Sequence, residues 1–338
     1  MTIKDVARRC GVSVSTVSRV LNHHPDVSDA VRSRVMEAVR DLHYVPNSSA
    51  RDLVLPASDA IGLVVRGVGN PFFTQVIRAV EQETVRRGLG MVFRQIRAGE
   101  DEVSCGAEIA RSKRLRGLIL LGGRYDYTPE RVAPLEVPFV CCTYTNSFGT
   151  LSRDACSSVS IDDRAAARRA VRVLTGLGHR KIAILLDSTR DRSISELRYR
   201  GYLEALAEAG IAPDAGLVVE TVEFEMDAAY ARTCRLLERR RDFTALFAVS
   251  DAMAIAAMKA LHDGGFRVPE DCSVIAIDGI ALSLYTVPTL TTLIQPQEAM
   301  GRTAVEILAD ILDGRGGNRH VRVEAELRPG GTVAPARK

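Results

Sequence analysis

Between residues 61 and 279 the chain alternates short apolar runs with longer amphipathic stretches, and this alternation constrains the fold most. Uninterrupted apolar runs predict strands buried on both faces, and strands separated by helices pair in parallel. The runs form two sets, so we expect two doubly wound α/β subdomains with ligand sites at the strand ends. The predicted strands are IGLVV, LGMVF, GLILL, VPFVCC and SVSID, then KIAILLD, LVVETVEF, ALFAVSD and CSVIAIDG.

Amphipathic stretches between these runs predict the covering helices, near residues 72–88, 102–114, 163–178, 195–210, 227–240 and up to about 265. A chain of 338 residues is long for one packed core. No apolar run approaches the ~20 residues of a membrane span, and the polar N-terminus carries no secretion signal. We therefore expect a cytoplasmic protein with no membrane partner. The seven cysteines include no CxxC pair, so reduced thiols are expected rather than a metal site or disulfides.

The first 45 residues follow a different pattern, which predicts three short helices. Asp5 lies in the first turn of a helix that Thr2 can cap, and Gly11 suits a sharp turn. Ser13 then caps a second helix. The inner faces of these two helices are formed by Val6, Ala7, Val17, Val20 and Leu21.

The outer face of the second helix carries mostly small or polar side chains and one arginine, and it has no acidic residue. Small side chains allow close approach to a major groove, and arginine can read guanine there. The alternative is an ordinary helical hairpin, but the third capped helix disfavours it. Four of the first 22 residues are basic and one is acidic, so this segment has a net charge of +3, equal to that of the whole chain. The candidate DNA-binding residues on this helix are Val14, Ser15, Thr16, Ser18, Arg19 and Asn22.

The third helix follows Val27 and Ser28, which can staple and cap it, and ends near Tyr44 because Pro46 disfavours helix at the residue before it. Its buried stripe is predicted to be Val31, Val35, Ala38, Val39 and Leu42.

These segments carry a close resemblance to a known family. TIKDVA, GVSVSTVSRVLN, the Val27-Ser28 pair and YVPNSSARDL stand at the spacing found in the lactose-repressor (LacI/GalR) family of bacterial transcription regulators. Further motifs, among them NPFF, SVSIDD, GHRKIAIL, RYRGY and PTLTTLIQP, extend the resemblance over essentially the whole chain.

The resemblance implies an α + α/β chain, with a helix-turn-helix head at 1–45 and a hinge helix at 46–57. A two-subdomain sensor of the type I periplasmic-binding-protein kind would fill 58–338. Its N-subdomain would span about 58–160 and 290–318, and its C-subdomain about 161–289 and 319–338, with a last strand near 321–327. The implied function is a dimeric repressor of a near-palindromic double-stranded operator, controlled by a small carbohydrate effector.

Residues 46–56 form the joint between head and sensor. Prolines bracket a segment too short for a stable isolated helix. The resemblance implies a hinge helix that folds on DNA and inserts a leucine into the minor groove, where an apolar wedge can unstack bases. The alternative is a plain linker. Val54 stands where many members have a basic residue, and the matching hinge residues are Asn47, Ala50, Arg51 and Leu53.

By the same resemblance, seven residues are candidates for effector contact. Aromatic faces hold flat apolar surfaces, whereas Arg and Asp make charge-assisted bonds to hydroxyls. Phe72 and Phe73 could instead be core, and Asp251 could simply cap the helix that follows it. Three arginines (Arg66, Arg124 and Arg192) either make the cleft basic, for an acidic or phosphorylated sugar, or are merely solvated. The candidates are Phe72, Phe73, Arg192, Arg198, Phe224, Asp251 and Asp278.

Other classes of function fit less well. No GxSxG, P-loop, HExxH or post-strand GxGxxG motif is present, so neither catalysis nor a cofactor is expected. A solute-binding protein would need a signal peptide and no head, and a sugar-converting enzyme with an appended head remains a further alternative. Corepression by a nucleobase is the alternative to induction by a sugar. The final residues show no heptads, so we expect a dimer rather than a tetramer.

If Leu53 is the wedge, Leu53→Ala should lower operator affinity and reduce DNA bending while the sensor's ligand affinity stays the same. The operator should carry a flexible pyrimidine–purine step at its centre. A circular-permutation gel assay measures the bend. Unchanged bending would favour the plain linker.

Overall fold

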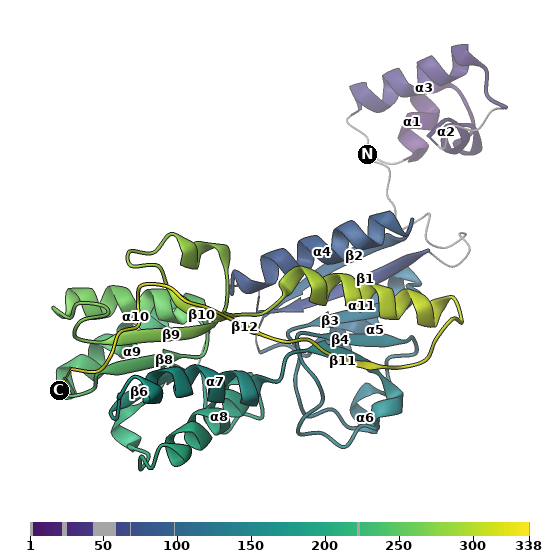
Figure 1. Cartoon of the computed structure of the whole chain (residues 1–338). Helices are drawn as coiled ribbons and strands as arrows, with labels where there is room; N and C mark the ends of the chain where they lie inside the picture. Colours follow the sequence, from purple (N-terminus) through teal and green to yellow (C-terminus); the bar gives the residue numbers. More distant parts are fainter. Residues whose placement is uncertain are drawn as a thin grey trace. The chain divides into compact units, whose positions relative to one another are not determined.

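The structure is a computed structural model that describes residues 3–21, 26–42 and 59–337, apart from 68, 98, 222 and 223. The chain divides into two compact units, Met1–Pro56 and Ala57–Lys338, which Figure 1 colours along the sequence. The division at Pro56 falls within the segment expected to be the hinge.

The first unit contains three described helices around a small apolar core. They are α1 (Ile3–Cys10), α2 (Val14–Leu21) and α3 (Asp29–Asp41). Val6, Val17, Val20 and Val35 are fully buried, which confirms the predicted inner faces. Gly11 adopts a φ of 63°, a conformation that is cheap for glycine alone. Thr2 and Tyr44 lie outside the described residues.

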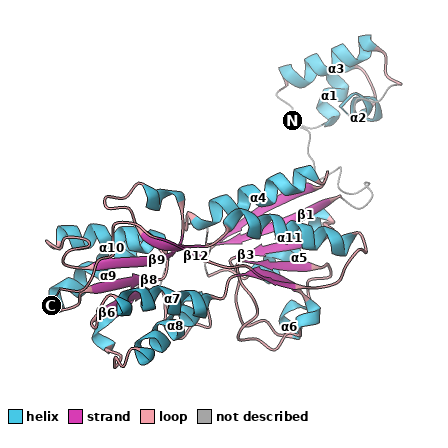
Figure 2. Ribbon diagram, viewed as in Figure 1, coloured by secondary structure: helices cyan, strands magenta, loops and turns pink. Residues whose placement is uncertain are grey.

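The second unit contains two sheets, each six-stranded over the described residues (Figure 2). The N-sheet runs in the order β11-β5-β4-β3-β1-β2 and is parallel throughout. The strand order reverses at β1: β2, the next strand in sequence, lies on one side of β1, whereas β3 lies on the other side. The strands are β1 (Ala60–Arg66), β2 (Gly90–Ile96), β3 (Gly117–Leu121), β4 (Phe139–Cys142), β5 (Ser157–Ser160) and β11 (His320–Arg322).

The C-sheet repeats this arrangement in the order β12-β10-β9-β8-β6-β7. All its pairs are parallel except β12 with β10, which is antiparallel. The strands are β6 (Ile182–Leu186), β7 (Val218–Glu220), β8 (Ala245–Ala248), β9 (Ser273–Asp278), β10 (Thr291–Ile294) and β12 (Glu326–Arg328).

Helices cover both faces of each sheet, which explains why the central strands are apolar on both sides. Ile61, Leu63 and Val65 of β1 pack under α4 and α11, whereas Val64 packs with α5. In the second half, α7 packs against α8, and α9 against α10. The helices are α4 (Phe72–Arg86), α5 (Glu102–Lys113), α6 (Pro129–Val132), α7 (Asp163–Gly176), α8 (Ile194–Glu208), α9 (Met226–Arg239), α10 (Asp251–Asp263) and α11 (Gln297–Leu312), with short 3-10 turns η2 (Arg153–Ala155), η3 (Ala215–Leu217) and η4 (Ala281–Leu284).

The chain passes between the sheets three times, after β5, after β10 and after β11. Two predicted crossing points need correction. Residues 291–294 still belong to the C-sheet, where β10 pairs with β9, so the second crossing follows Ile294 instead of preceding residue 290. The strand predicted near 321–327 is two strands: β11 joins the N-sheet beside β5, and only β12 joins the C-sheet. Each has three residues, too few for periodicity to separate them.

No helix in the described part of the chain is long and apolar enough to cross a membrane. All seven cysteines are free thiols in the structure.

The packing of α8 on α7 depends on Gly201. A Cβ added there would lie 2.2 Å from the Arg164 carbonyl oxygen and 2.9 Å from the Arg168 amide nitrogen, and neither backbone atom can move aside alone. We expect Gly201→Ala to lower the free energy of unfolding by ~1–3 kcal/mol in urea denaturation. Gly176→Ala is the matched control, because an added Cβ there meets nothing within 4 Å. Equal stability of the two variants would contradict this account.

Candidate functional site

Helix α2 presents an exposed polar surface on the first unit. The Thr16 amide donates to Ser13 Oγ at 3.1 Å, so Ser13 caps the helix as predicted. Ser13 Oγ also lies 2.7 Å from Ser15 Oγ, which gathers hydroxyls at the helix start. Val14, Ser15 and Arg19 are exposed, and no acid occupies the first turn. A positive helix end without an acid suits a phosphate backbone.

Thr16 and Ser18 are half-buried on the same helix. The other candidate DNA-binding residues, Asn22, Asn47, Ala50, Arg51 and Leu53, lie outside the described residues.

In the second unit, Arg198 of α8 forms the centre of a buried charge cluster. Its side chain is 1% exposed. Nε and Nη2 donate to one carboxylate oxygen of Asp163 at 3.1 and 2.9 Å, and Nη1 donates to the Val249 carbonyl. Asp278 Oδ1 lies 3.7 Å from Nη1. The structure therefore brings Arg198 and Asp278 together, and adds Asp163 to them.

Asp278 ends β9 in an unusual conformation. Its φ of 141° is rare outside glycine, and Gly279 follows at 74°. Gln295 Nε2 donates to its Oδ1 at 2.9 Å, and Gln297 Nε2 donates to its carbonyl oxygen at 3.0 Å. Burial raises the pKa of Asp278 to about 7, against the opposing pull of Arg198 and with help from the charge on Asp251. A strained, buried carboxylate at a strand end is a candidate binding group.

The two predicted aromatic residues have different surroundings. Phe72 is buried in the apolar cluster under α4 and α11, and so is part of the core. Phe73 is half-buried, with its ring centroid 5.6 Å from that of Phe72. A Cβ at Gly122 would lie 2.7 Å from Phe73 Cζ, which places this ring at the end of β3.

Asp251, at the start of α10, is fully buried, and both of its carboxylate oxygens are occupied by the fold. One accepts from the Ile280 amide at 2.9 Å and the other from the Thr292 hydroxyl. Burial raises its pKa, although the Thr292 bond opposes the shift. The helix is capped by Ser250, whose Oγ accepts from the Met253 amide. Asp251 thus holds η4 against β10, and an effector would have to share an oxygen already in use.

Arg192 is exposed on the loop before α8, with a φ of 54°. Phe224 is half-buried and packs against the apolar core of the C-sheet.

Three residues of the Arg198 cluster were not predicted from the sequence. Asp163 follows Asp162 in SVSIDD, and the pair resembles a helix cap; Asp162 does accept from the Ala165 amide, which leaves Asp163 for Arg198. Gln295 and Gln297 lie in the IQPQ stretch, where the only available signal was two amides next to a crossing point.

Elements at the carboxyl ends of the two sheets contact each other. Ile280, which follows β9, packs in the same cluster as Phe72, which follows β1. Leu197 of α8 packs against the N-sheet cluster that contains Tyr125. Tyr125 is close enough to Asp163 and Arg198 for their charges to affect its pKa, which burial raises. The buried charges therefore lie where the two subdomains meet, the position in which doubly wound folds bind ligands.

Comparison with known proteins gives matches for both units. Residues 2–47 match the profile of bacterial regulatory proteins of the lacI family, and residues 171–333 match a periplasmic-binding-protein-like domain. The chain is 38% identical over 329 residues to the HTH-type transcriptional regulator MalR of Clostridium butyricum, covering 97% of both chains.

Two solved structures match nearly the full length. A complex of the transcriptional regulator CelR with cellobiose gives a TM-score of 0.73 at 30% identity, covering 98% of this chain and 99% of that one. The lac repressor dimer bound to operator and the anti-inducer ONPF gives a TM-score of 0.69 at 26% identity, covering 99% of each.

One guanidinium between two buried carboxylates predicts opposite effects for two matched substitutions. Because the pKa of Asp278 is raised, the folded state binds a proton that the unfolded state releases at lower pH, so stability falls as pH rises from about 4 to 7. Asparagine does not titrate in this range, so Asp278→Asn removes the loss of stability with rising pH. The difference in stability between the variant and the unmodified chain should therefore shift in favour of the variant from pH 5 to pH 8, by on the order of 2 kcal/mol. Asp163→Asn breaks the doubly bonded pair and should lose ~3–5 kcal/mol at both pH values. Urea denaturation at both pH values measures this. A loss of equal size for both variants at pH 8 would show that the carboxylates are equivalent.

Proposed function

The chain belongs to the lacI family of bacterial regulatory proteins, and we propose that it is a repressor whose operator affinity is controlled by a sugar or sugar derivative. One observation carries this: a single chain joins a three-helix head with an exposed, acid-free second helix to a unit whose buried charges gather where two doubly wound subdomains meet. Such a pairing suits a protein that reads DNA and responds to a small molecule. In this proposal the protein acts in the cytoplasm and catalyses no reaction.

The DNA half of the proposal assigns base reading to the exposed face of α2. Arg19 can bond a guanine edge through two donors, and the small residues Ser15 and Thr16 allow the helix to approach the groove floor. Asn47, Ala50, Arg51 and Leu53 are proposed to contact the minor groove as a hinge, with Leu53 as the wedge.

The effector half assigns polar contacts to Arg198 and Asp278, with the half-buried faces of Phe73 and Phe224 as walls. Arg192 is exposed and available to a ligand, whereas Phe72 and Asp251 support these groups from behind. A sugar is favoured because the CelR structure holds cellobiose at 30% identity over nearly the whole chain. Corepression by a nucleobase is the second candidate, and the same polar groups would then contact ring nitrogens.

A two-fold operator requires a two-fold protein, and we propose a homodimer formed through the second unit. Leu282, Leu284, Tyr285 and Val287 are exposed together on and after η4, and Phe93 is exposed on the edge strand β2. The run of exposed apolar residues on and after η4 suits burial against a second copy. The lac repressor structure, at 26% identity, is of a dimer on its operator.

Arg19→Ala tests the DNA half. A bidentate contact to a base is worth ~1–3 kcal/mol of discrimination. The variant should therefore lose preference at one base pair of each half-site while retaining its affinity for random DNA, as measured by fluorescence anisotropy on operator and scrambled duplexes. Equal weakening on both duplexes would make Arg19 a phosphate contact.

A further inference from the structure

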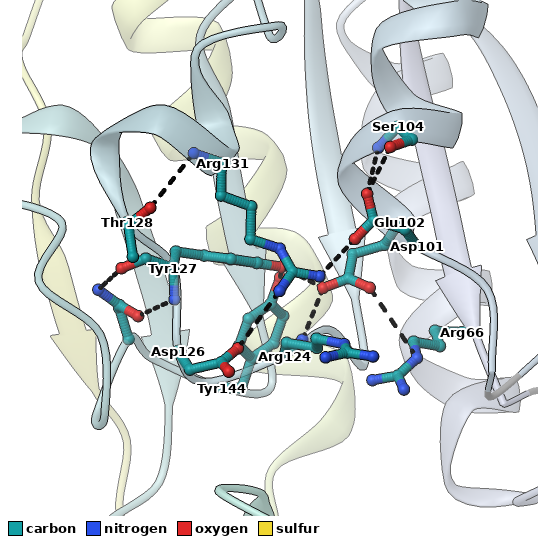
Figure 3. Close-up of polar contacts among 11 residues, drawn as sticks. Arg66, Asp101, Glu102, Ser104, Arg124, Asp126, Tyr127, Thr128, Arg131 and Tyr144 are labelled. Carbon is teal, nitrogen blue, oxygen red and sulfur yellow. Dashed lines mark hydrogen bonds and ion pairs between the residues drawn. The ribbon is translucent and has the colours of Figure 1, made fainter.

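A second polar network lies at the carboxyl edge of the N-sheet, apart from Arg198 (Figure 3). Its centre is Glu102, the first residue of α5, which is 1% exposed. Asp101 caps that helix by accepting from the Ser104 amide at 2.9 Å, so Glu102 is not needed as the cap. Arg66 ends β1, and Arg124 follows β3. Glu102 therefore lies between the ends of these two neighbouring strands.

Among the described residues, only one of the two Glu102 oxygens has a hydrogen-bond partner. Oε1 accepts from the Arg124 amide at 2.7 Å and from the Tyr127 hydroxyl at 2.6 Å, and the Tyr127 hydroxyl lies 2.7 Å from that of Tyr144. Oε2 is buried without a hydrogen bond from any described residue. Its ion pair with Arg66 Nε spans 3.9 Å, longer than a hydrogen bond. A buried acceptor left without a donor is costly unless a ligand or water supplies one.

The position of Oε2 is where ligands bind in this type of fold. The N-sheet changes direction between β1 and β3, and open α/β sheets bind ligands outside the carboxyl ends of the strands at that point. The network also adjoins the Arg198 cluster: the ring of Tyr144 lies 5.4 Å from that of Tyr125, whose pKa is influenced by Asp163 and Arg198.

The geometry suits a hydroxyl group. An oxygen about 2.8 Å from both Oε2 and Arg66 Nε completes a triangle on the 3.9 Å separation. A hydroxyl there donates to the carboxylate and accepts from the guanidinium, which uses both of its capacities. Arg124 Nε is likewise buried without a hydrogen-bond partner among the described residues, and provides a second donor nearby.

The charges disfavour an anion. The guanidinium groups of Arg66, Arg124 and Arg131 lie among the carboxylates of Asp101, Glu102 and Asp126 (Figure 3). Arg131 contacts Asp101 at 2.5 Å and Asp126 at 3.7 Å, so its charge is neutralised locally. In the adjoining cluster, Arg198 lies between two carboxylates. A phosphate group with a charge near −2 would meet a buried carboxylate and no net positive charge.

We propose that Glu102, with Arg66 and Arg124, is the specificity subsite that binds a hydroxyl of an uncharged sugar and rejects phosphorylated sugars. This rests on the proposed function and names the class of effector. The sequence left two alternatives for Arg66, a basic cleft that suits a phosphorylated sugar or a merely solvated side chain. In this proposal Arg66 does neither, and instead donates to a hydroxyl of a neutral ligand.

The test uses the full-length protein and isothermal titration with cellobiose, maltose, ribose, glucose, glucose 6-phosphate and hypoxanthine. The unmodified chain should bind at least one neutral sugar, and should bind glucose 6-phosphate no better than glucose. Glu102→Gln should weaken the neutral sugar at least ~10-fold, because a hydrogen bond to a charged acceptor is lost. It should also shift the ratio of affinities toward glucose 6-phosphate at least ~10-fold, because the repelling charge is gone. The matched control is Glu108→Gln, an exposed glutamate on the same helix, which should bind as the unmodified chain does.

Thermal melting shows whether Glu102→Gln folds. If it does not, Arg66→Met replaces it: this variant removes the donor at the partly exposed strand end and should weaken the neutral sugar at least ~5-fold without admitting the phosphate. Loss of sugar binding in Asp278→Asn but not in Glu102→Gln would overturn the subsite and leave the proposed function intact. Preference of the unmodified chain for glucose 6-phosphate or hypoxanthine would also overturn it. A panel in which nothing binds would contradict the proposed function, and the subsite with it.

Discussion

The arrangement of the second unit depends on one buried guanidinium. Arg198 is 1% exposed, and its donors bond Asp163 at the start of α7 and the Val249 carbonyl just after β8. Asp278, at the end of β9, lies 3.7 Å from Nη1. A buried cation is tolerated only when paired and hydrogen-bonded, so these elements are held in register by the need to satisfy it. Burial raises the pKa of Asp278 to about 7, because the opposing pull of this one cation does not offset the cost of desolvating the carboxylate. The strand ends thus hold a charge group that a ligand can contact without first having to order it.

The sequence predicted the elements well because their apolar faces are long and regular. The strand from Gly117 to Leu121 coincides with GLILL, and the stripe of Val17 and Val20 is buried as helical spacing required. Prediction failed where elements are short and polar. The strands β11 and β12 have three residues each, and period-2 alternation cannot be recognised in so few.

The site was predicted less completely, for a different reason. Arg198 and Asp278 stood out because charge at a strand or helix end is costly to bury. Asp163 and Glu102 did not, because an acid in the first turn of a helix is already explained by the helix dipole. Only the structure shows that Asp162 and Asp101 cap those helices, leaving their neighbours for other contacts. For Phe72, a ligand candidate by resemblance with the core as its alternative, the structure shows a side chain buried in the apolar cluster.

The cluster is also attached to the segments that join the sheets. Asp163 follows the first crossing directly. Gln295, which bonds the Asp278 side chain, lies in the second crossing, and Gln297, which bonds the Asp278 carbonyl oxygen, begins α11 just after it. A ligand that bonds Arg198 or Asp278 therefore competes with or reinforces the same hydrogen bonds that fix the crossing segments. Differential affinity for two arrangements of those segments is the only means by which a ligand can shift their populations. A change in the angle between the subdomains would then need no separate relay, because the proposed binding groups and the residues at the crossing segments form one hydrogen-bonded set.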